Sequence, residues 1–288
     1  MTQAPEYTMT FDDQDSPVAK AAENPDLAND LARRVLNATN PAPEISDPGD
    51  THVVLPAGLV VNDVVERNAE VQELTGAHEE ALAKARTSGN AAKYVNTLLQ
   101  CGVVSIGDRP VTNNDLASLL QGDLDALILG IRRATFGDEF EVFAAECPEC
   151  GASSDITLNL ADIPMKELED PAQRTFEVEL RKGRKAVIKF PTGAVQTEIY
   201  KKPMSVPEMN SLTLAECVLE FIEKDGTRRM SNGLTDVKNL GVADRLTLQE
   251  YIFNNQPGPR YDQVTAACSS CESEVPVPLN VGILFREL

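Results

Sequence analysis

The spacing of apolar residues changes along the chain, and the changes mark the predicted helices and strands. Apolar side chains recur every three to four residues in several stretches, which is typical of helices that bury one face. These helical stretches are residues 90–104, 122–133, 192–202, 207–222 and 242–254. Apolar and polar residues alternate in 176–180 and 185–190, which predicts strands, and residues 52–61 predict a strand, a Pro-Gly turn and a second strand. The pattern therefore indicates an α+β fold.

Two further pairs of alternating segments each flank a C-x-x-C motif, which predicts a β-hairpin with two cysteines in its turn. The pairs are Cys147 with Cys150 and Cys268 with Cys271. The flanking strands are residues 139–146 and 154–160 for the first pair, and 261–267 and 275–281 for the second. Two such turns supply the four thiolates of a tetrahedral structural zinc site. We therefore expect Zn²⁺ as a structural cofactor, held by these four cysteines.

Disulfides and redox chemistry are the alternatives for these thiols. Residues 1–24 contain no apolar stretch of the kind found in signal peptides, so we expect the thiols to stay reduced. A thioredoxin-type C-x-x-C follows a strand at a helix start and does not lie inside a hairpin. The two other cysteines, Cys101 and Cys217, stand among leucines in predicted helices and are expected to be buried apolar residues.

The two cysteine hairpins belong to segments that resemble each other. Residues 123–160 align without a gap on residues 244–281, at an offset of 121. Nine of the 38 aligned positions are identical, against roughly two or three expected by chance. We therefore expect an internally duplicated helix–helix–Cys-hairpin unit, with two β-hairpin zinc knuckles joined at one site of four cysteines. Asp123 and Asp244 recur in this alignment, and both are interpreted as helix caps.

The predicted organisation has three parts. Residues 1–50 form an acidic, Pro-rich flexible arm. Residues 51–160 are the first repeat, with Cys147 and Cys150, and residues 161–288 are the second, with Cys268 and Cys271. Within the arm, residues 24–36 predict a short amphipathic helix, and a helix of this kind serves as a docking peptide or forms only transiently. Its partner-binding residues are Leu27, Leu31, Val35 and Leu36.

Composition excludes several functional classes. The chain of 288 residues carries 45 acidic and 26 basic side chains, a net charge of −19, which disfavours nucleic acid as a partner. No apolar run is long enough to span a membrane. The sequence has no phosphate-binding loop and no nucleophile–base motif, and four cysteine ligands leave a zinc ion no open position. We therefore expect a protein that is not an enzyme and binds no small-molecule substrate.

Several segments, in this order, resemble the T-even-phage-type baseplate hub assembly proteins of contractile phage tails and contractile injection systems. They are Leu55-Pro56-Ala57-Gly58, residues 71–81, 98–101, 105–107, 120–123, Arg-Arg-Ala-Thr-Phe-Gly-Asp at 132–138, the Cys147/Cys150 knuckle and Phe190-Pro191-Thr192-Gly193. The resemblance extends from residue 52 to residue 288, and the acidic arm lies outside it.

The resemblance implies a non-enzymatic protein that works at the tail baseplate, located in the virion after assembly in the host cytoplasm. Its partners would be other tail and baseplate proteins, namely hub or wedge subunits. Two roles remain open, a resident structural component and an assembly chaperone that is absent from the mature particle. A zinc-ribbon nucleic-acid-binding module is the alternative outside this class, and the acidic charge disfavours it.

Overall fold

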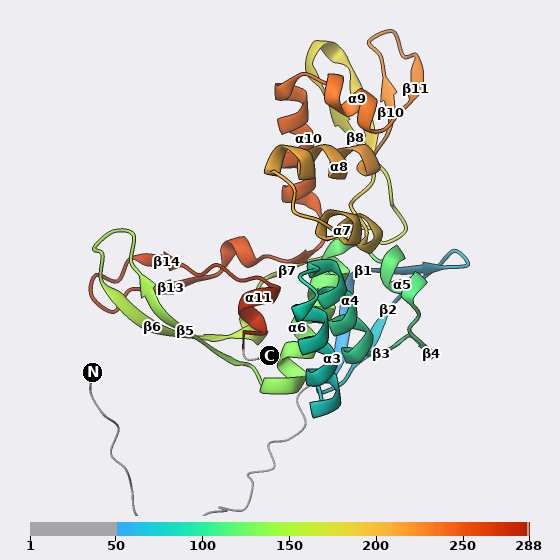
Figure 1. Ribbon diagram of the computed structural model, residues 1–288. Helices are drawn as coiled ribbons and strands as arrows, with labels where there is room; N and C mark the ends of the chain where they lie inside the picture. The colour runs from blue at the N-terminus through green and yellow to red at the C-terminus, as the bar shows by residue number, and fades with distance from the viewer. Residues whose placement is uncertain (1–50, 287) are drawn as a thin grey trace, which may run out of the picture. The chain divides into compact units, whose positions relative to one another are not determined.

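The computed structural model describes residues 51–286 and 288, which lie within one compact unit, Pro48–Leu288. The predicted arm at 1–50 falls outside the described residues, and with it the helix at 24–36 and the side chains of Leu27, Leu31, Val35 and Leu36. The described chain mixes helices and sheets, so the α+β class is confirmed (Figure 1).

The first part of the described chain builds a four-stranded antiparallel sheet and its helices. The sheet has the order β1-β2-β3-β4. Its strands are β1 (His52–Val61), β2 (Val64–Val71), β3 (Val103–Ile106) and β4 (Arg109–Pro110). The helices are α3 (Gly76–Thr87), α4 (Ala91–Gly102), α5 (Asn113–Ser118) and α6 (Gln121–Phe136). The hairpin of β5 (Glu139–Glu146) and β6 (Ser153–Asn159) follows α6 directly.

The second part repeats this order of elements. Its sheet has the order β8-β9-β10-β11, again antiparallel throughout. The strands are β8 (Phe176–Glu179), β9 (Lys185–Ile188), β10 (Val218–Ile222) and β11 (Arg228–Met230). The helices are α7 (Gly193–Tyr200), α8 (Val206–Cys217), α9 (Leu234–Asn239) and α10 (Val242–Asn255). The hairpin of β13 (Thr265–Ala267) and β14 (Glu274–Pro276) follows α10.

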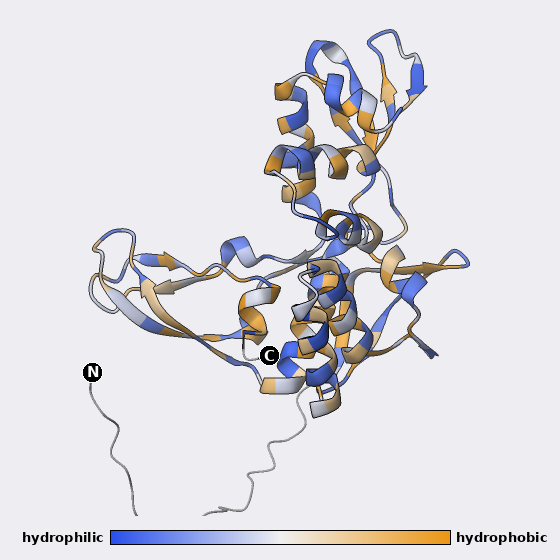
Figure 2. Ribbon diagram, viewed as in Figure 1, coloured by the Kyte–Doolittle hydropathy of each residue, from blue (hydrophilic) through white to orange (hydrophobic). Residues whose placement is uncertain are grey.

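Short elements connect these parts. Strand β7 (Met165–Lys166) pairs with β12 (Gly258–Pro259), and α11 (Val281–Leu284) packs against α6. Three 3-10 turns complete the described elements: η1 (Leu160–Asp162), η2 (Arg181–Gly183) and η3 (Tyr261–Gln263). Hydrophobic and hydrophilic residues are interspersed along the helices (Figure 2).

The predicted helix at 207–222 is wrong in its last five residues. Helix α8 ends at Cys217, and Val218–Ile222 forms β10, a strand between β9 and β11. Val218 and Phe221 are buried there, because pairing with β9 places them against the second core. Tertiary pairing outweighs the helical spacing of the apolar residues in this segment. The predicted helix at 90–104 likewise ends at Gly102, and Val103 begins β3.

The buried residues form two clusters. The first core combines the first sheet and its helices with both cysteine hairpins and α11. From the C-terminal end of the chain it includes Val264, Val275, Val277, Leu279, Leu284 and Phe285. The second core lies between the second sheet and helices α8, α9 and α10, and it also takes in Ala57 and Leu120. The C-terminal hairpin therefore packs with the first core and not with the sheet that precedes it in sequence.

The interpretation of Asp123 and Asp244 as helix caps is wrong. The N-cap residues of α6 and α10 are Leu120 and Gly241, and each aspartate lies one turn further in, almost fully buried. Asp123 Oδ1 accepts hydrogen bonds from the backbone N–H groups of Ala57 (2.8 Å) and Gly58 (3.1 Å) in β1. Burial, the largest influence, raises the pKa of the Asp123 carboxyl.

Asp244 makes comparable contacts in the second half, with the hairpin of β8 and β9. Its Oδ1 accepts the N–H of Arg181 at 2.9 Å, and its Oδ2 pairs with the guanidinium of Arg184 at 2.7 Å. Arg181 and Arg184 flank the turn between β8 and β9. Asp123 therefore ties α6 to β1, and Asp244 ties α10 to the turn between β8 and β9.

The carboxyl group of Asp125 in α6 should make the stability of the chain depend on pH. Burial raises its pKa to about 7, well above the ordinary value of 3.8. The unfolded chain loses this proton at a lower pH than the folded chain, so the folded state loses stability as the pH rises from about 4 to about 7. Asp125→Asn should remove this loss. The full shift corresponds to about 4 kcal/mol, but Asp125 is only partly buried and solvent screens its charge. The variant should therefore gain roughly 2 kcal/mol on the natural chain across that interval and nothing further above it.

Urea unfolding of both proteins at several pH values between 4.5 and 8.5 checks this expectation. Asp162→Asn is the matched control, because it makes the same substitution at an exposed aspartate, where it should add little stability. Parallel profiles for the natural chain and Asp125→Asn would contradict the prediction.

Candidate metal centre

The two cysteine turns have the same backbone structure. In the first, Cys147 N–H donates to the Ala152 carbonyl (2.9 Å) and Gly151 N–H donates to the Cys147 carbonyl (2.9 Å). In the second, Cys268 N–H donates to the Ser273 carbonyl (2.8 Å) and Glu272 N–H donates to the Cys268 carbonyl (2.9 Å). Corresponding donors and acceptors are 121 residues apart, which is the offset seen in the sequence.

The fold brings the four cysteines of both turns to one point. Their Sγ atoms all lie within 4.8 Å of one another. The Sγ atoms of Cys147 and Cys271 are 3.7 Å apart, and so are those of Cys150 and Cys268. Each close pair thus consists of one cysteine from each turn. In each turn the first cysteine is buried and the second is exposed.

This arrangement fits a zinc ion. A tetrahedral site with Zn–S bonds of ~2.3 Å places its sulfur atoms ~3.8 Å apart, close to the two 3.7 Å separations. All four donors are thiols, and no carboxylate or imidazole belongs to the cluster among the described residues. A set of four thiolates leaves the ion no open position, so the centre is suited to a structural role and not to activating water.

Ser273 lies beside the cysteines and favours their ionisation. Its hydroxyl is 3.1 Å from Cys147 Sγ and 3.0 Å from Cys271 Sγ. The hydrogen bond with Ser273 is the main reason why the pKa of Cys147 falls to about 6, and it also lowers the pKa of Cys271. The N–H of Ala152 favours the Cys150 thiolate, but the neighbouring sulfur of Cys271 and burial raise the pKa of Cys150 to about 12. A dication among the sulfurs is what would allow all four to ionise.

The backbone of the second turn carries a strain that the first avoids. Glu272 has φ of 61°, and the corresponding residue of the first turn is Gly151, with φ of 69°. A side chain in this left-handed conformation costs about 1–2 kcal/mol. Glu272→Gly should therefore raise the free energy of unfolding by about 0.5–1 kcal/mol, after allowance for the greater freedom of glycine in the unfolded chain.

Urea unfolding at saturating zinc checks this expectation. Gly151→Ala is the matched control, because it introduces the same strain in the other turn and should lower the free energy of unfolding by about 1 kcal/mol. A lower stability for Glu272→Gly would show that the Glu272 side chain makes a contact that outweighs its backbone strain.

The other cysteines lie away from this cluster. Cys217 is fully buried at the end of α8, and burial raises its pKa to about 12. Cys101 is partly buried near the end of α4, where burial also raises its pKa. Sequence reasoning did not identify Ser273 as a neighbour of the sulfurs. Its position two residues after Cys271 was the available signal.

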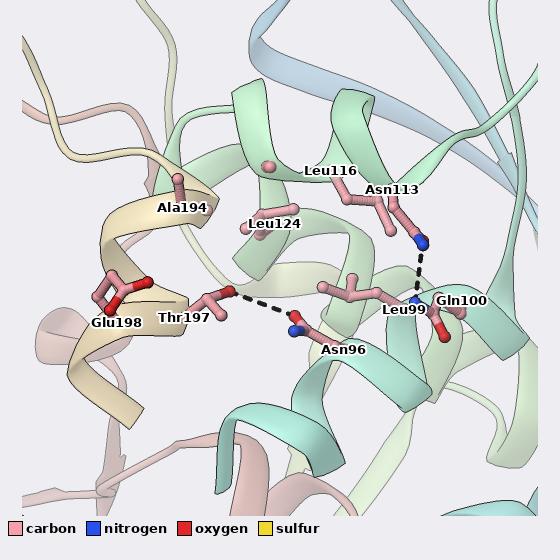
Figure 3. Close-up of a pocket in the computed structure, with 11 residues that line it drawn as sticks. Asn96, Leu99, Gln100, Asn113, Leu116, Leu124, Ala194, Thr197 and Glu198 are labelled. Carbon is pink, nitrogen blue, oxygen red and sulfur yellow. Dashed lines mark hydrogen bonds between the residues drawn. The ribbon is translucent and has the colours of Figure 1, made fainter. Parts of the chain in front are cut away.

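A separate cleft of 320 Å³ lies among α4, α5, α6 and α7 (Figure 3). Its polar lining is mostly amide, and two hydrogen bonds cross it: Gln100 Nε2 to Asn113 Oδ1 (2.9 Å) and Thr197 Oγ1 to Asn96 Oδ1 (3.5 Å). Leu99, Leu116 and Leu124 form its apolar part. No cysteine, serine or histidine is among the residues that line this cleft.

Comparison with known proteins identifies one family. The family model described as "T4 bacteriophage base plate protein" matches residues 61–274, about three quarters of the chain. No curated protein and no solved structure matches the chain. Among the described residues, no helix combines the length and the apolar character needed to cross a membrane.

Proposed function

Because the chain belongs to the T4 bacteriophage base plate protein family, a family of phage tail proteins, we propose that it is a resident structural component of a contractile-tail baseplate. In this role it binds other hub or wedge subunits and catalyses no reaction. The observation that carries the proposal is the family match over residues 61–274, which covers most of both parts of the chain and all four clustered cysteines.

A structural Zn²⁺ ion bound by Cys147, Cys150, Cys268 and Cys271 would join the two halves of the chain. The close sulfur pairs link one hairpin to the other, so a bound ion cross-links segments 121 residues apart. Such a cross-link suits a component that must keep its shape within a large assembly. The ligand separations and the purely sulfur donor set support zinc over harder cations, which prefer oxygen.

The two halves would derive from one duplicated unit, with a division near residue 160. The shared order of strands and helices supports this view, as does the matching hydrogen bonding of the two cysteine turns. Helices α5 and α9 also differ by 121 residues at both ends. In each half a buried aspartate at the third position of a helix accepts backbone N–H groups from the segment that begins that half, β1 in the first and the β8–β9 turn in the second.

The partners would be proteins. A net charge of −19 favours contacts with basic protein surfaces and disfavours nucleic acid, whose phosphates need clustered lysine and arginine. Mixed DNA at low salt should therefore show no binding to the purified chain.

Quantitative mass spectrometry of purified mature particles tests the proposal. A resident component should be present in a fixed ratio to the other baseplate proteins. Its absence from mature particles, together with its presence in assembly intermediates, would overturn residence and support the role of an assembly chaperone.

A further inference from the structure

The last long helix of the second part, α10, exposes apolar side chains to solvent. Val242 is 73% exposed, Leu246 50% and Phe253 53%. Only three of the fourteen residues of α10 are buried, whereas eleven of the sixteen residues of the corresponding helix α6 are buried. Within the described residues α10 packs mainly against α8, which leaves its opposite side open.

The exposed side chains follow the pattern of a helix–helix seam. Val242, Leu246, Gln249 and Phe253 are spaced by four, three and four residues, so they form one stripe along α10. This is the spacing of the a and d positions of a coiled coil, in which one polar residue commonly fixes the register. Gln249 occupies that polar position.

Clefts border this stripe near Phe253. A cavity of 260 Å³ between α8 and α10 is lined by Thr213, Leu214, Gln249 and Phe253, among others. A second cavity, of 140 Å³, lies beyond Phe253 and is lined by Gln256, Pro257 and Gly258. Phe253 therefore stands between two hollows that could receive side chains of a partner.

The first half shows what covers the equivalent stripe. At the offset of 121, Leu246, Gln249 and Phe253 correspond to Asp125, Ile128 and Arg132 of α6. Ile128 and Arg132 are 1% and 4% exposed, and the Tyr261 hydroxyl donates to the Asp125 carbonyl at 3.4 Å. Helix α11 also packs on α6. Segments from elsewhere in the chain thus cover α6. On α10 the contact to the stripe comes from Arg260, whose guanidinium lies 5.4 Å from the centre of the Phe253 ring, and Val242, Leu246 and Phe253 all stay at least half exposed.

The exposed area of the stripe is too small to account for a stable homodimer. The three apolar residues together expose on the order of 300 Å², which is the size of a functional surface patch. A stable dimer needs roughly 800 Å² from each partner. The stripe alone is therefore too small to hold two free molecules together, but it is sufficient for one contact among several within an assembly, where the effective concentration is high.

We propose that the α10 stripe, defined by Val242, Leu246, Gln249 and Phe253, is the docking site for an amphipathic helix of a neighbouring baseplate subunit. The partner helix lies along α10 and inserts its own apolar residues at the same four–three spacing. This inference rests on the proposed function, because it requires that the chain resides in the baseplate.

Site-specific photo-cross-linking tests the contact in mature particles. The benzophenone amino acid p-benzoylphenylalanine replaces Gln249 in the full-length chain, which leaves the apolar residues of the stripe in place. Irradiation should link the chain to one other tail protein. The control position is Met230 of β11, which is 68% exposed and lies outside the stripe, and it should not give this product. Linkage to a second copy, linkage to residues 1–50 of the same chain, or no linkage from a resident chain would overturn the proposal.

A pair of double variants measures the contribution of the stripe. Leu246→Glu with Phe253→Glu should lower incorporation into particles by at least ~100-fold, since each buried apolar side chain changes an association constant by roughly tenfold or more. The matched control is Val206→Glu with Met230→Glu, at positions 63% and 68% exposed, and it should be incorporated normally. Both variants should keep the zinc content and the unfolding midpoint of the natural chain.

The outcomes separate this inference from the proposed function. Normal incorporation of the stripe variant would overturn the docking site and leave the baseplate role intact. Unfolding of that variant in isolation would show that the stripe belongs to the chain's own core, and this result would also overturn the docking site. Absence of the natural chain from mature particles would overturn the resident role and the docking site together.

Discussion

Replacing Cys147 by serine should abolish zinc binding at the proposed centre and destabilise both halves of the chain in one transition. The two hairpins are linked through sulfur pairs that cross from one to the other, so the loss of one ligand weakens both. The free energy of unfolding should fall by on the order of 4 kcal/mol, the scale expected when a structural metal is lost from a domain that retains a core. Elemental analysis should show well under one zinc per chain.

The matched control for this substitution is Cys101→Ser. Cys101 is a partly buried thiol that lies outside the cluster, so its replacement should leave one zinc per chain and nearly the original unfolding midpoint. Cys147→Ser with a full complement of zinc and unchanged stability would contradict the proposed centre. The same holds for a natural chain that is purified under reducing conditions with free thiols and binds no added zinc.

Replacing Asp123 by alanine should lower the free energy of unfolding by roughly 3–5 kcal/mol. The substitution leaves the N–H groups of Ala57 and Gly58 without their acceptor inside the protein. It also removes the carboxylate beside Arg174, whose guanidinium donates to the carbonyl groups of the same two residues. Gly58 has φ of 81° in the irregular stretch of β1, so this part of the strand depends on its partners to hold its shape. Urea unfolding measures the change.

Asp123→Asn is the matched control, because it keeps an oxygen for both N–H groups and should lose less than half as much stability. Asp244→Ala tests the equivalent position and should also be strongly destabilising, because Arg181 N–H and the Arg184 guanidinium lose their acceptor. If Asp123→Ala and Asp123→Asn unfolded at the same urea concentration, the hydrogen bonds to Ala57 and Gly58 would not be the source of the stability.

Local patterns predicted the cysteine hairpins and most helices, because these features depend on short-range spacing. The offset of 121 was visible because the cysteines, Asp123 and Asp244 recur in one ungapped alignment. The structure brings the four predicted cysteines together. The identity of the metal and the role of Leu27, Leu31, Val35 and Leu36 remain predictions.

Contacts between distant segments could not be inferred in the same way. Strand β10 continues the apolar spacing of α8, and only pairing with β9 makes it a strand. Asp123 resembles a helix cap in sequence, and only the approach of β1 shows that its acceptor role is tertiary. Gly122 meets β12 so closely that a side chain at this position would overlap the Pro257 carbonyl. No spacing rule encodes such an approach.

The makeup of the first core constrains the order in which the chain can fold. Phe140 and Ile156 of the first hairpin share that core with Val275, Leu279 and Phe285, which the ribosome adds well over a hundred residues after Phe140. The second sheet and its helices, synthesised in between, can gather their own core before the first is complete. During synthesis the apolar face of the first hairpin therefore stays uncovered until the C-terminal segment is made. A product truncated before Val275 would keep this face exposed and would be prone to aggregate.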